Sequence, residues 1–114
     1  MDKNIIKHLE RMIQMIEKIE RYSVGIETYE QFIADEKNVD LCIVPLIQIG
    51  EIAWSMSKIY QIKPDIPYKE IVWFRNILVH TYHKVETKAL WRIITKNIPI
   101  LKIKIQEFYD QNNY

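Results

Sequence analysis

Apolar residues recur every three or four positions along the first part of the chain, and this spacing constrains the fold more than any other feature. The residues in this series are Ile5, Leu9, Met12, Ile16 and Ile19. Such spacing places them on one face of an α-helix that packs against a core. The whole chain has two glycines and four prolines, so turns must be few and elements long. We therefore predict an all-α fold, an up-and-down bundle of four to five helices in a single domain spanning residues 1–114.

The same reasoning places five helices, with Gly25 and several prolines as the main interruptions. We expect them over residues 2–24, 27–34, 38 or 40 to 60, 71 to 82 or 83, and 86–110. The third is apolar almost throughout, so it should be the central helix and is a candidate dimer contact. Pro45 either removes one hydrogen bond from it or marks a later start near Val44. Pro99 predicts a kink or a short break in the last helix.

The cellular setting is constrained by what the chain lacks. Cys42 is the single cysteine and stands among apolar residues, which favours a buried thiol and a reducing, cytoplasmic environment. The amino terminus leads into charged amphipathic sequence, so we expect no secretory signal. We expect no apolar run that approaches the roughly 20 residues needed to span a bilayer, and hence a protein without a membrane contact.

The predicted helix over residues 71–82 carries the only cluster of residue types used in catalysis. At about 100° per residue, one arc should pack against the core; it holds Ile71, Trp73, Phe74, Ile77 and Leu78. The opposite arc holds Arg75, Asn76, Val79, His80, Tyr82 and His83. One face of this helix therefore presents a guanidinium, an amide, two imidazoles and a phenol.

These groups suit the cleavage of RNA. A histidine with a pKa of about 6.5 exchanges protons near neutral pH, and an arginine binds phosphate without losing its charge. His80 would remove the proton of a ribose 2′-hydroxyl while Arg75 stabilises the phosphorane. Asn76 would orient His80 or hold a phosphate oxygen. Glu51, polar among apolar residues, should point at solvent or at a partner such as Arg75.

RNA cleavage also needs a general acid, and one chain offers one well-placed histidine. A symmetric homodimer would bring two copies of the polar face together around one cleft, and His83 is the alternative second group. Metal-dependent hydrolysis is less favoured because the acidic residues are scattered, and we expect no metal and no cofactor.

Positive charge concentrates around and after this helix, although the net charge is only +1. Residues 1–57 carry a formal charge of −4 and residues 58–104 one of +7. Four basic residues follow one another at intervals of four, namely Lys84, Lys88, Arg92 and Lys96. They should form one positive ridge, which is either a solvated face or a guide for an RNA backbone.

The motif residues resemble a known family. Arg75-Asn76-x3-His80 is similar to the signature of the HEPN superfamily of helical RNases, and Arg75-x4-His80-x-Tyr82 resembles its HepT-like toxin branch. Three further segments resemble that branch, namely residues 49–53 (Ile-Gly-Glu-Ile-Ala), Pro67-Tyr68 and residues 85–94. The resemblance therefore spans most of the chain, with Tyr68 in place of the family's tryptophan.

The resemblance implies a dimeric helical bundle in which Arg75 and His80 of both subunits line a metal-independent endoribonuclease cleft. It also implies a type VII-like toxin–antitoxin pair. In such a pair a minimal nucleotidyltransferase antitoxin transfers AMP from ATP to the motif tyrosine, here Tyr82.

Two other functions stay open at this point. The polar face could belong to a noncatalytic module that binds a nucleotide or the nucleotidyltransferase, or the chain could be a purely structural dimerisation bundle. We expect Trp54, Trp73 and Trp91 to be core or dimer anchors more often than platforms for RNA bases. The RNA substrate is not specified by any of these patterns.

Overall fold

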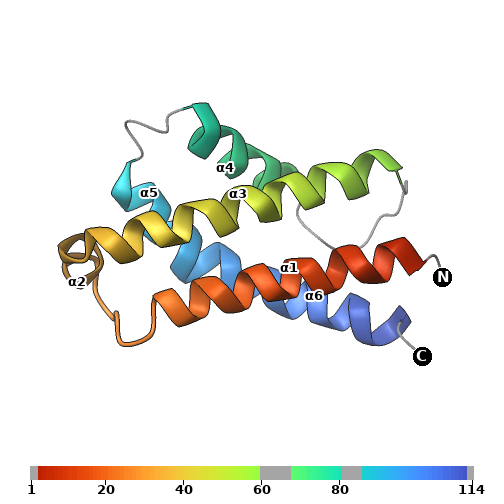
Figure 1. Ribbon diagram of the computed structural model, residues 1–114, viewed down its shortest axis with the longest axis horizontal. Coiled ribbons are helices and arrows are strands. Elements are labelled where there is room, and N and C mark those ends of the chain that lie inside the picture. The colour runs from red at the N-terminus through yellow and green to blue at the C-terminus, as the bar shows by residue number, and fades with distance from the viewer. Residues whose placement is uncertain (1–2, 60–67, 81–85, 113–114) are drawn as a thin grey trace.

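The computed structural model describes residues 3–59, 68–80 and 86–112, and these are helical almost throughout, without a strand among them. The elements in chain order are α1 (Lys3–Tyr22), α2 (Tyr29–Ala34), α3 (Glu36–Ile59), α4 (Tyr68–His80), α5 (Thr87–Arg92), the π-helical turn η2 (Ile93–Asn97) and α6 (Ile98–Asn112). Figure 1 shows α5, η2 and α6 following one another as the last long element. The prediction of an all-α, HEPN-like bundle is confirmed.

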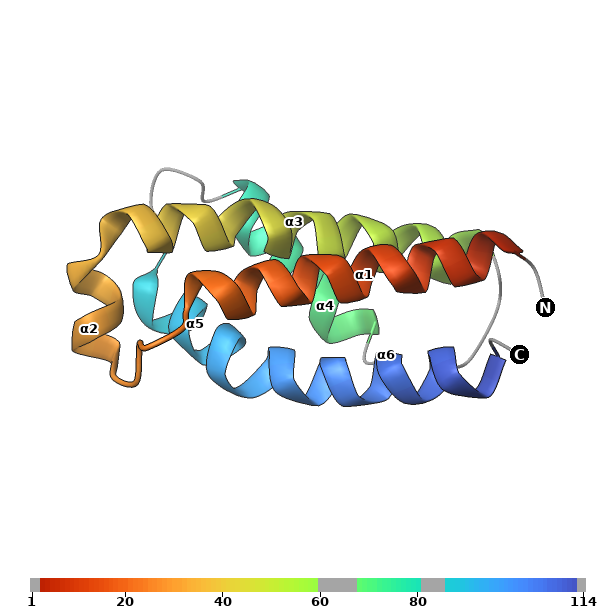
Figure 2. The ribbon, with the colours of Figure 1, turned by 60° about the horizontal axis from the view of Figure 1, so that its bottom comes forward.

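The long helices run up and down beside one another. α1 packs against both α3 and α6, while α4 packs mainly against α3. Figures 1 and 2 show α4 crossing obliquely behind α3, with the start of α1 and the end of α6 at the end of the bundle opposite α2. A single core cluster draws buried side chains from every one of these long helices. The catalytic residue types on α4 are thus positioned chiefly by α3.

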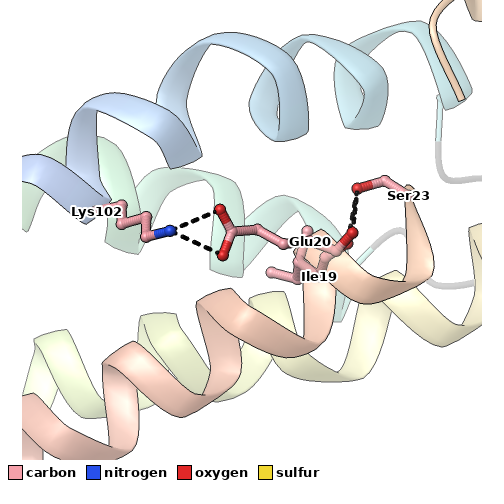
Figure 3. A network of polar contacts seen from close by, with 4 residues as sticks. All are labelled: Ile19, Glu20, Ser23 and Lys102. Carbon is pink, nitrogen blue, oxygen red and sulfur yellow. Dashed lines mark hydrogen bonds and ion pairs between the residues drawn. The ribbon is translucent and has the colours of Figure 1, made fainter. Parts of the chain in front are cut away.

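The apolar series of α1 is buried as predicted, with every member at most 4% exposed. α1 ends at Tyr22, two residues before the predicted end. The Ser23 hydroxyl donates a hydrogen bond to the Ile19 carbonyl at 2.8 Å, which satisfies an oxygen at the helix terminus (Figure 3). Gly25 then turns the chain with a φ of 80°, a left-handed conformation that glycine adopts without strain.

α2 closes one end of the bundle. Its first turn has a capping box, in which the Thr28 hydroxyl accepts from the Gln31 backbone and the Gln31 side chain accepts from Thr28. The ring of Phe32, fully buried, lies 5.1 Å from that of Trp91 on α5. The Tyr29 hydroxyl shares a hydrogen bond of 2.6 Å with the Thr87 hydroxyl. Trp91 therefore anchors the core, as expected.

α3 is continuous from Glu36 to Ile59, so the later start near Val44 is wrong. It begins before Asn38 because the Asp35 carboxylate accepts the Asn38 backbone N–H at 3.2 Å, as an N-cap does. Residues 36–56 are, by length and composition, long and apolar enough to cross a membrane, contrary to our expectation. Half of that window is buried inside the bundle, where α3 packs against α1 and α4. A central core helix passes the same test of length and composition.

The break predicted at Pro99 is a local change of helix type. In η2 the Ile98 N–H donates to the carbonyl of Ile93, five residues earlier. Proline lacks an N–H and its ring clashes with the carbonyl four residues before it, here that of Thr95. A π-turn widens the helix at that point, and the chain continues as α6 without a loop.

Candidate active site

Arg75 of α4 is held by Glu51 of α3. The Arg75 Nε and Nη2 atoms both donate to Glu51 Oε1, at 2.9 and 2.5 Å. Of the two positions we considered for Glu51, the structure selects contact with Arg75. The arginine side chain is 27% exposed and the glutamate side chain 49%, so the pair lies at the surface and faces solvent.

Gly50 makes this arrangement possible. A Cβ atom added at Gly50 would lie 2.1 Å from Arg75 Cβ and 2.4 Å from Arg75 Cγ, distances that real side chains do not tolerate. The same added atom would lie 3.5 Å from the Arg75 Cα, so the two helices cross at this point with nothing between them. Gly50 therefore permits the close approach of α4 to α3. The side chain of Arg75 extends across Gly50 and reaches Glu51, the next residue of α3.

Asn76 is the second residue that holds the Arg75 guanidinium by a hydrogen bond. Its Oδ1 accepts from Arg75 Nη1 at 2.7 Å. A guanidinium has five N–H groups, and in the described part of the chain three of them donate to Glu51 and Asn76. Nη1 and Nη2 each keep one N–H, which suits a bidentate contact with a phosphate. Asn76 therefore contacts Arg75 in this structure, and its predicted contacts with His80 or a phosphate stay predictions.

The buried face of α4 is narrower than the sequence pattern predicted. Ile71, Phe74 and Leu78 are each 1% exposed, whereas Trp73 is 56% exposed and Ile77 only half-buried. The placement of Trp73 in the core is therefore wrong. An obliquely crossing helix has a smaller sector covered by its neighbours than one that lies parallel to them (Figure 2). Trp54 of α3, at 47% exposed, is not a core residue either.

The other flank of α4 faces η2. The Asn97 amide donates a hydrogen bond to Glu70 in the first turn of α4. Beside this contact is a hollow of about 90 Å³ between α4, η2 and α6. It is lined by Glu70, Ile71, Phe74, Lys96, Asn97, Ile100 and Leu101. Neither the hollow nor the Asn97 contact was foreseen, since both join segments that are distant in the sequence.

The predicted basic ridge is only partly described. Lys88 and Arg92 are exposed on α5, and Lys96 is exposed in η2, where it lines the hollow. A straight ridge at intervals of four assumes α-helical geometry, which η2 interrupts. Lys84 lies outside the described residues, and binding of RNA by the other three stays a prediction.

Three further residues of the predicted site are not described in full. α4 ends at His80, whose backbone is helical but whose side chain lies outside the described residues. Tyr82 and His83 lie outside them altogether. Their alignment with Arg75 on one face therefore stays a prediction.

Family comparison agrees with the motif. The family model "Ribonuclease HepT-like" matches residues 12–108, a range that contains Gly50, Glu51 and the motif from Arg75 to Tyr82. The chain belongs to the HepT-like ribonuclease family. The resemblance identified from the motif residues is thereby confirmed.

Individual relatives are similar along most of the HepT-like chain. "Probable ribonuclease HepT" from Thermococcus cleftensis is 32% identical over 101 residues, which are 88% of this chain and 91% of the relative. "Putative RNase TTE0752" from Caldanaerobacter subterraneus subsp. tengcongensis is 31% identical over 101 residues, covering 88% and 89% of the two chains. "Gamma-glutamylcyclotransferase and putative RNase MJ0434" from Methanocaldococcus jannaschii is 31% identical over 116 residues, 98% of this chain but 52% of that protein. No solved structure matches the chain.

Proposed function

We propose that this HepT-like protein is a metal-independent endoribonuclease whose reaction centre includes Arg75, Asn76 and His80. One observation carries the proposal: the Arg75 guanidinium, five residues before His80, is fixed by Glu51 and Asn76, and two of its N–H groups donate to none of the described residues. The names of its relatives, which call them ribonucleases, support the same reaction class. A fixed cation and a histidine that acts as the base are what cleavage at a ribose 2′-hydroxyl needs.

In the proposed reaction, His80 takes the proton of the 2′-hydroxyl. The 2′-oxygen attacks the adjacent phosphorus, and the bond from phosphorus to the 5′-oxygen breaks. The leaving 5′-oxygen takes a proton from a general acid, giving a 2′,3′-cyclic phosphate and a 5′-hydroxyl. The unused N–H groups of Arg75 bind the non-bridging oxygens, whose negative charge grows in the transition state.

We propose that a second copy of the chain supplies the general acid. Both helices carry an exposed apolar side chain one turn from the ion pair. On α4 it is Val79, four residues after Arg75, and on α3 it is Trp54, three residues after Glu51. Val44 extends this surface along α3 at 56% exposed. A homodimer formed through this face would bury the three side chains and bring two histidines to one cleft.

Sedimentation velocity tests the homodimer. Val44→Glu should convert a dimer into monomers and remove activity, because a buried unpaired charge opposes association. The matched control is Ile103→Glu, which changes an equally exposed residue of α6. A monomeric wild-type protein that cleaves RNA would contradict the shared cleft.

We also propose that the protein is the toxin of a type VII-like pair in the cytoplasm, neutralised when a minimal nucleotidyltransferase transfers AMP to Tyr82. The added phosphate would compete with RNA for the nearby guanidinium. Incubation with that enzyme and ATP should add one AMP to the wild type and none to Tyr82→Phe, as measured by mass spectrometry. Modification at another residue, or none, would contradict this part.

The nuclease itself is tested by cleavage of RNA in EDTA. The wild type should cleave and leave cyclic phosphate ends, whereas His80→Ala should lose at least a hundredfold in rate, the usual contribution of a general base being about 10²- to 10⁴-fold. Equal cleavage by both proteins would remove His80 from the mechanism. Saturable RNA binding that Arg75→Ala weakens, without cleavage by any variant, would favour the noncatalytic module instead.

A further inference from the structure

We propose that the exposed face of α4 is a binding track for single-stranded RNA, in which the indole of Trp73 stacks on a base near the scissile phosphate. This inference rests on the proposed ribonuclease function and adds a binding residue that the motif does not contain.

The three tryptophans have different surroundings. Trp91 packs against Phe32 in the core. The ring of Trp54 is covered on one face by the Lys58 ammonium, 4.6 Å from its centroid. Trp73 is 56% exposed, and no described residue stacks on its ring. A large aromatic face is therefore open to a ligand at this position of α4.

Trp73 stands in a line of positions that leads to the reaction centre. Lys69, Trp73, Asn76 and His80 follow one another at intervals of four, three and four residues. Such intervals keep their backbone positions on one side of a helix. At about 1.5 Å per residue, Trp73 and His80 are separated by roughly 10 Å along the axis. One RNA strand can contact both positions while its phosphate lies at Arg75.

The charges beside Trp73 favour a polyanion. Lys69 is exposed one turn before it on α4, and Lys96 is exposed on the neighbouring η2. The acidic side chain close by, Glu70, accepts the hydrogen bond from Asn97 and so is drawn toward η2. Cations along a groove with an aromatic platform between them are the combination that binds single strands, because every base has a stacking face.

A second protein copy is the competing occupant of the indole. Protein anchors of this kind usually sit within a continuous apolar patch. The residues one turn from Trp73 on α4 are instead the exposed Lys69 and Glu70 and the half-buried Asn76 and Ile77, of which only Ile77 is apolar. RNA is therefore the occupant that the surroundings favour.

The binding experiment uses the full chain with His80→Ala, so that the RNA stays intact. The fluorescence anisotropy of a labelled single-stranded RNA oligonucleotide measures its Kd. Adding Trp73→Ala or Trp73→Leu should raise the Kd about tenfold or more, since stacking is lost, while Trp73→Phe should stay within about threefold. Ile103→Ala is the matched control, an exposed apolar residue on α6 whose loss should leave the Kd unchanged.

A series of RNAs with one abasic nucleotide locates the stacked base. At one position, removal of the base should raise the Kd of the His80→Ala protein, which keeps Trp73. The same RNA should not raise the Kd of the variant that also carries Trp73→Ala any further, because both changes remove the same contact. Equal affinities of Trp73 and Trp73→Ala for intact RNA would overturn the proposal. So would a Trp73→Ala protein that sediments as a monomer where the parent is a dimer, since the indole would then be a subunit contact.

The outcomes also separate this inference from the proposed function. Cleavage of RNA by the wild type, with a KM that Trp73→Ala does not raise, would overturn the stacking proposal alone. Binding that depends on Trp73 in a wild type that never cleaves RNA would overturn the nuclease and leave the track in place.

Discussion

Glu51 is the residue through which α3 controls the orientation of Arg75. Surface ion pairs stabilise proteins by at most about 1 kcal/mol, so the two contacts from Arg75 to Glu51 matter more for geometry than for folding. A long side chain released from its partner samples several rotamers, and only some of them place the guanidinium on the phosphate.

We therefore predict that Glu51→Ala lowers kcat about tenfold, because a misplaced catalytic group costs one or two orders of magnitude in rate. The free energy of unfolding should change by less than about 1 kcal/mol. Initial rates over a range of RNA concentrations and urea denaturation measure the two effects. Glu17→Ala, an exposed glutamate on α1, is the control. A Glu51→Ala protein with undiminished kcat would show that Arg75 needs no support.

The close contact at Gly50 leads to a second prediction, in which two effects on the free energy of unfolding oppose each other. Alanine is favoured over glycine inside a helix by about 1 kcal/mol. The added methyl, however, would overlap the Arg75 side chain and force α3 and α4 apart. Overpacking costs about 1 to 3 kcal/mol, and we expect Gly50→Ala to be net destabilising and to lower the cleavage rate. Ser55→Ala in the same helix is the control; a Gly50→Ala protein more stable than wild type would contradict the close crossing.

The burial of Cys42 leads to a prediction about the reactivity of its thiol. Burial raises the pKa of the Cys42 thiol to about 11, because an apolar environment disfavours the thiolate. The buried neutral thiol thus contributes stability that is complete below the unfolded pKa of 9.0 and is lost as the pH rises through about 11. At pH 8 we expect Cys42 to react with a disulfide reagent only when the protein is unfolded in urea. Rapid reaction of the native protein would contradict the burial.

At the scale of elements, α4 is attached on two flanks, to α3 through Gly50 and Glu51 and to η2 through the bond from Asn97 to Glu70. The second attachment is made by Asn97, the last residue of the π-turn that precedes Pro99.

This attachment predicts a salt-dependent effect. Asn97→Asp replaces a hydrogen-bond donor by a carboxylate opposite Glu70, and the repulsion should lower the free energy of unfolding by about 1 kcal/mol at low salt. The loss should diminish at about 1 M salt, which screens the repulsion between the two charges. Asn97→Ala, which removes the bond without adding charge, should show no such recovery. Urea denaturation at low and high salt measures both variants, and a salt-independent loss in Asn97→Asp would contradict the contact.

At the scale of the whole molecule, one core cluster joins all the long helices. The surface contact between Lys102 of α6 and Glu20 of α1, at 2.9 Å, adds little to this because both side chains are nearly half exposed (Figure 3). The cohesion of the bundle therefore resides in its apolar contacts.

A single core predicts cooperative unfolding. Phe74→Ala should lower the free energy of unfolding by about 3 to 5 kcal/mol, since Phe74 is 1% exposed in the centre of α4. Helix content by circular dichroism and the tryptophan fluorescence should shift together in urea. The exposed Ile103→Ala is the control, and separate transitions for the two signals would contradict one cooperative core.

The helices themselves and the family were accessible from the sequence alone, and so was the choice of the residues that we propose for the reaction centre. The apolar spacing that starts at Ile5 predicted α1, and the grouping of Arg75, Asn76 and His80 singled out α4 and its family. These inferences succeed because helical periodicity and motif spacing are local properties, which α-helical geometry converts directly into shared faces.

The tertiary structure decided how the helices use those faces. It selected Arg75 over solvent as the partner of Glu51, left Trp73 at the surface, and converted the expected break at Pro99 into a π-turn that brings Asn97 to Glu70. Each outcome depends on where two helices cross and how much of each one the other covers. That crossing is set by packing between distant segments, which no local pattern specifies.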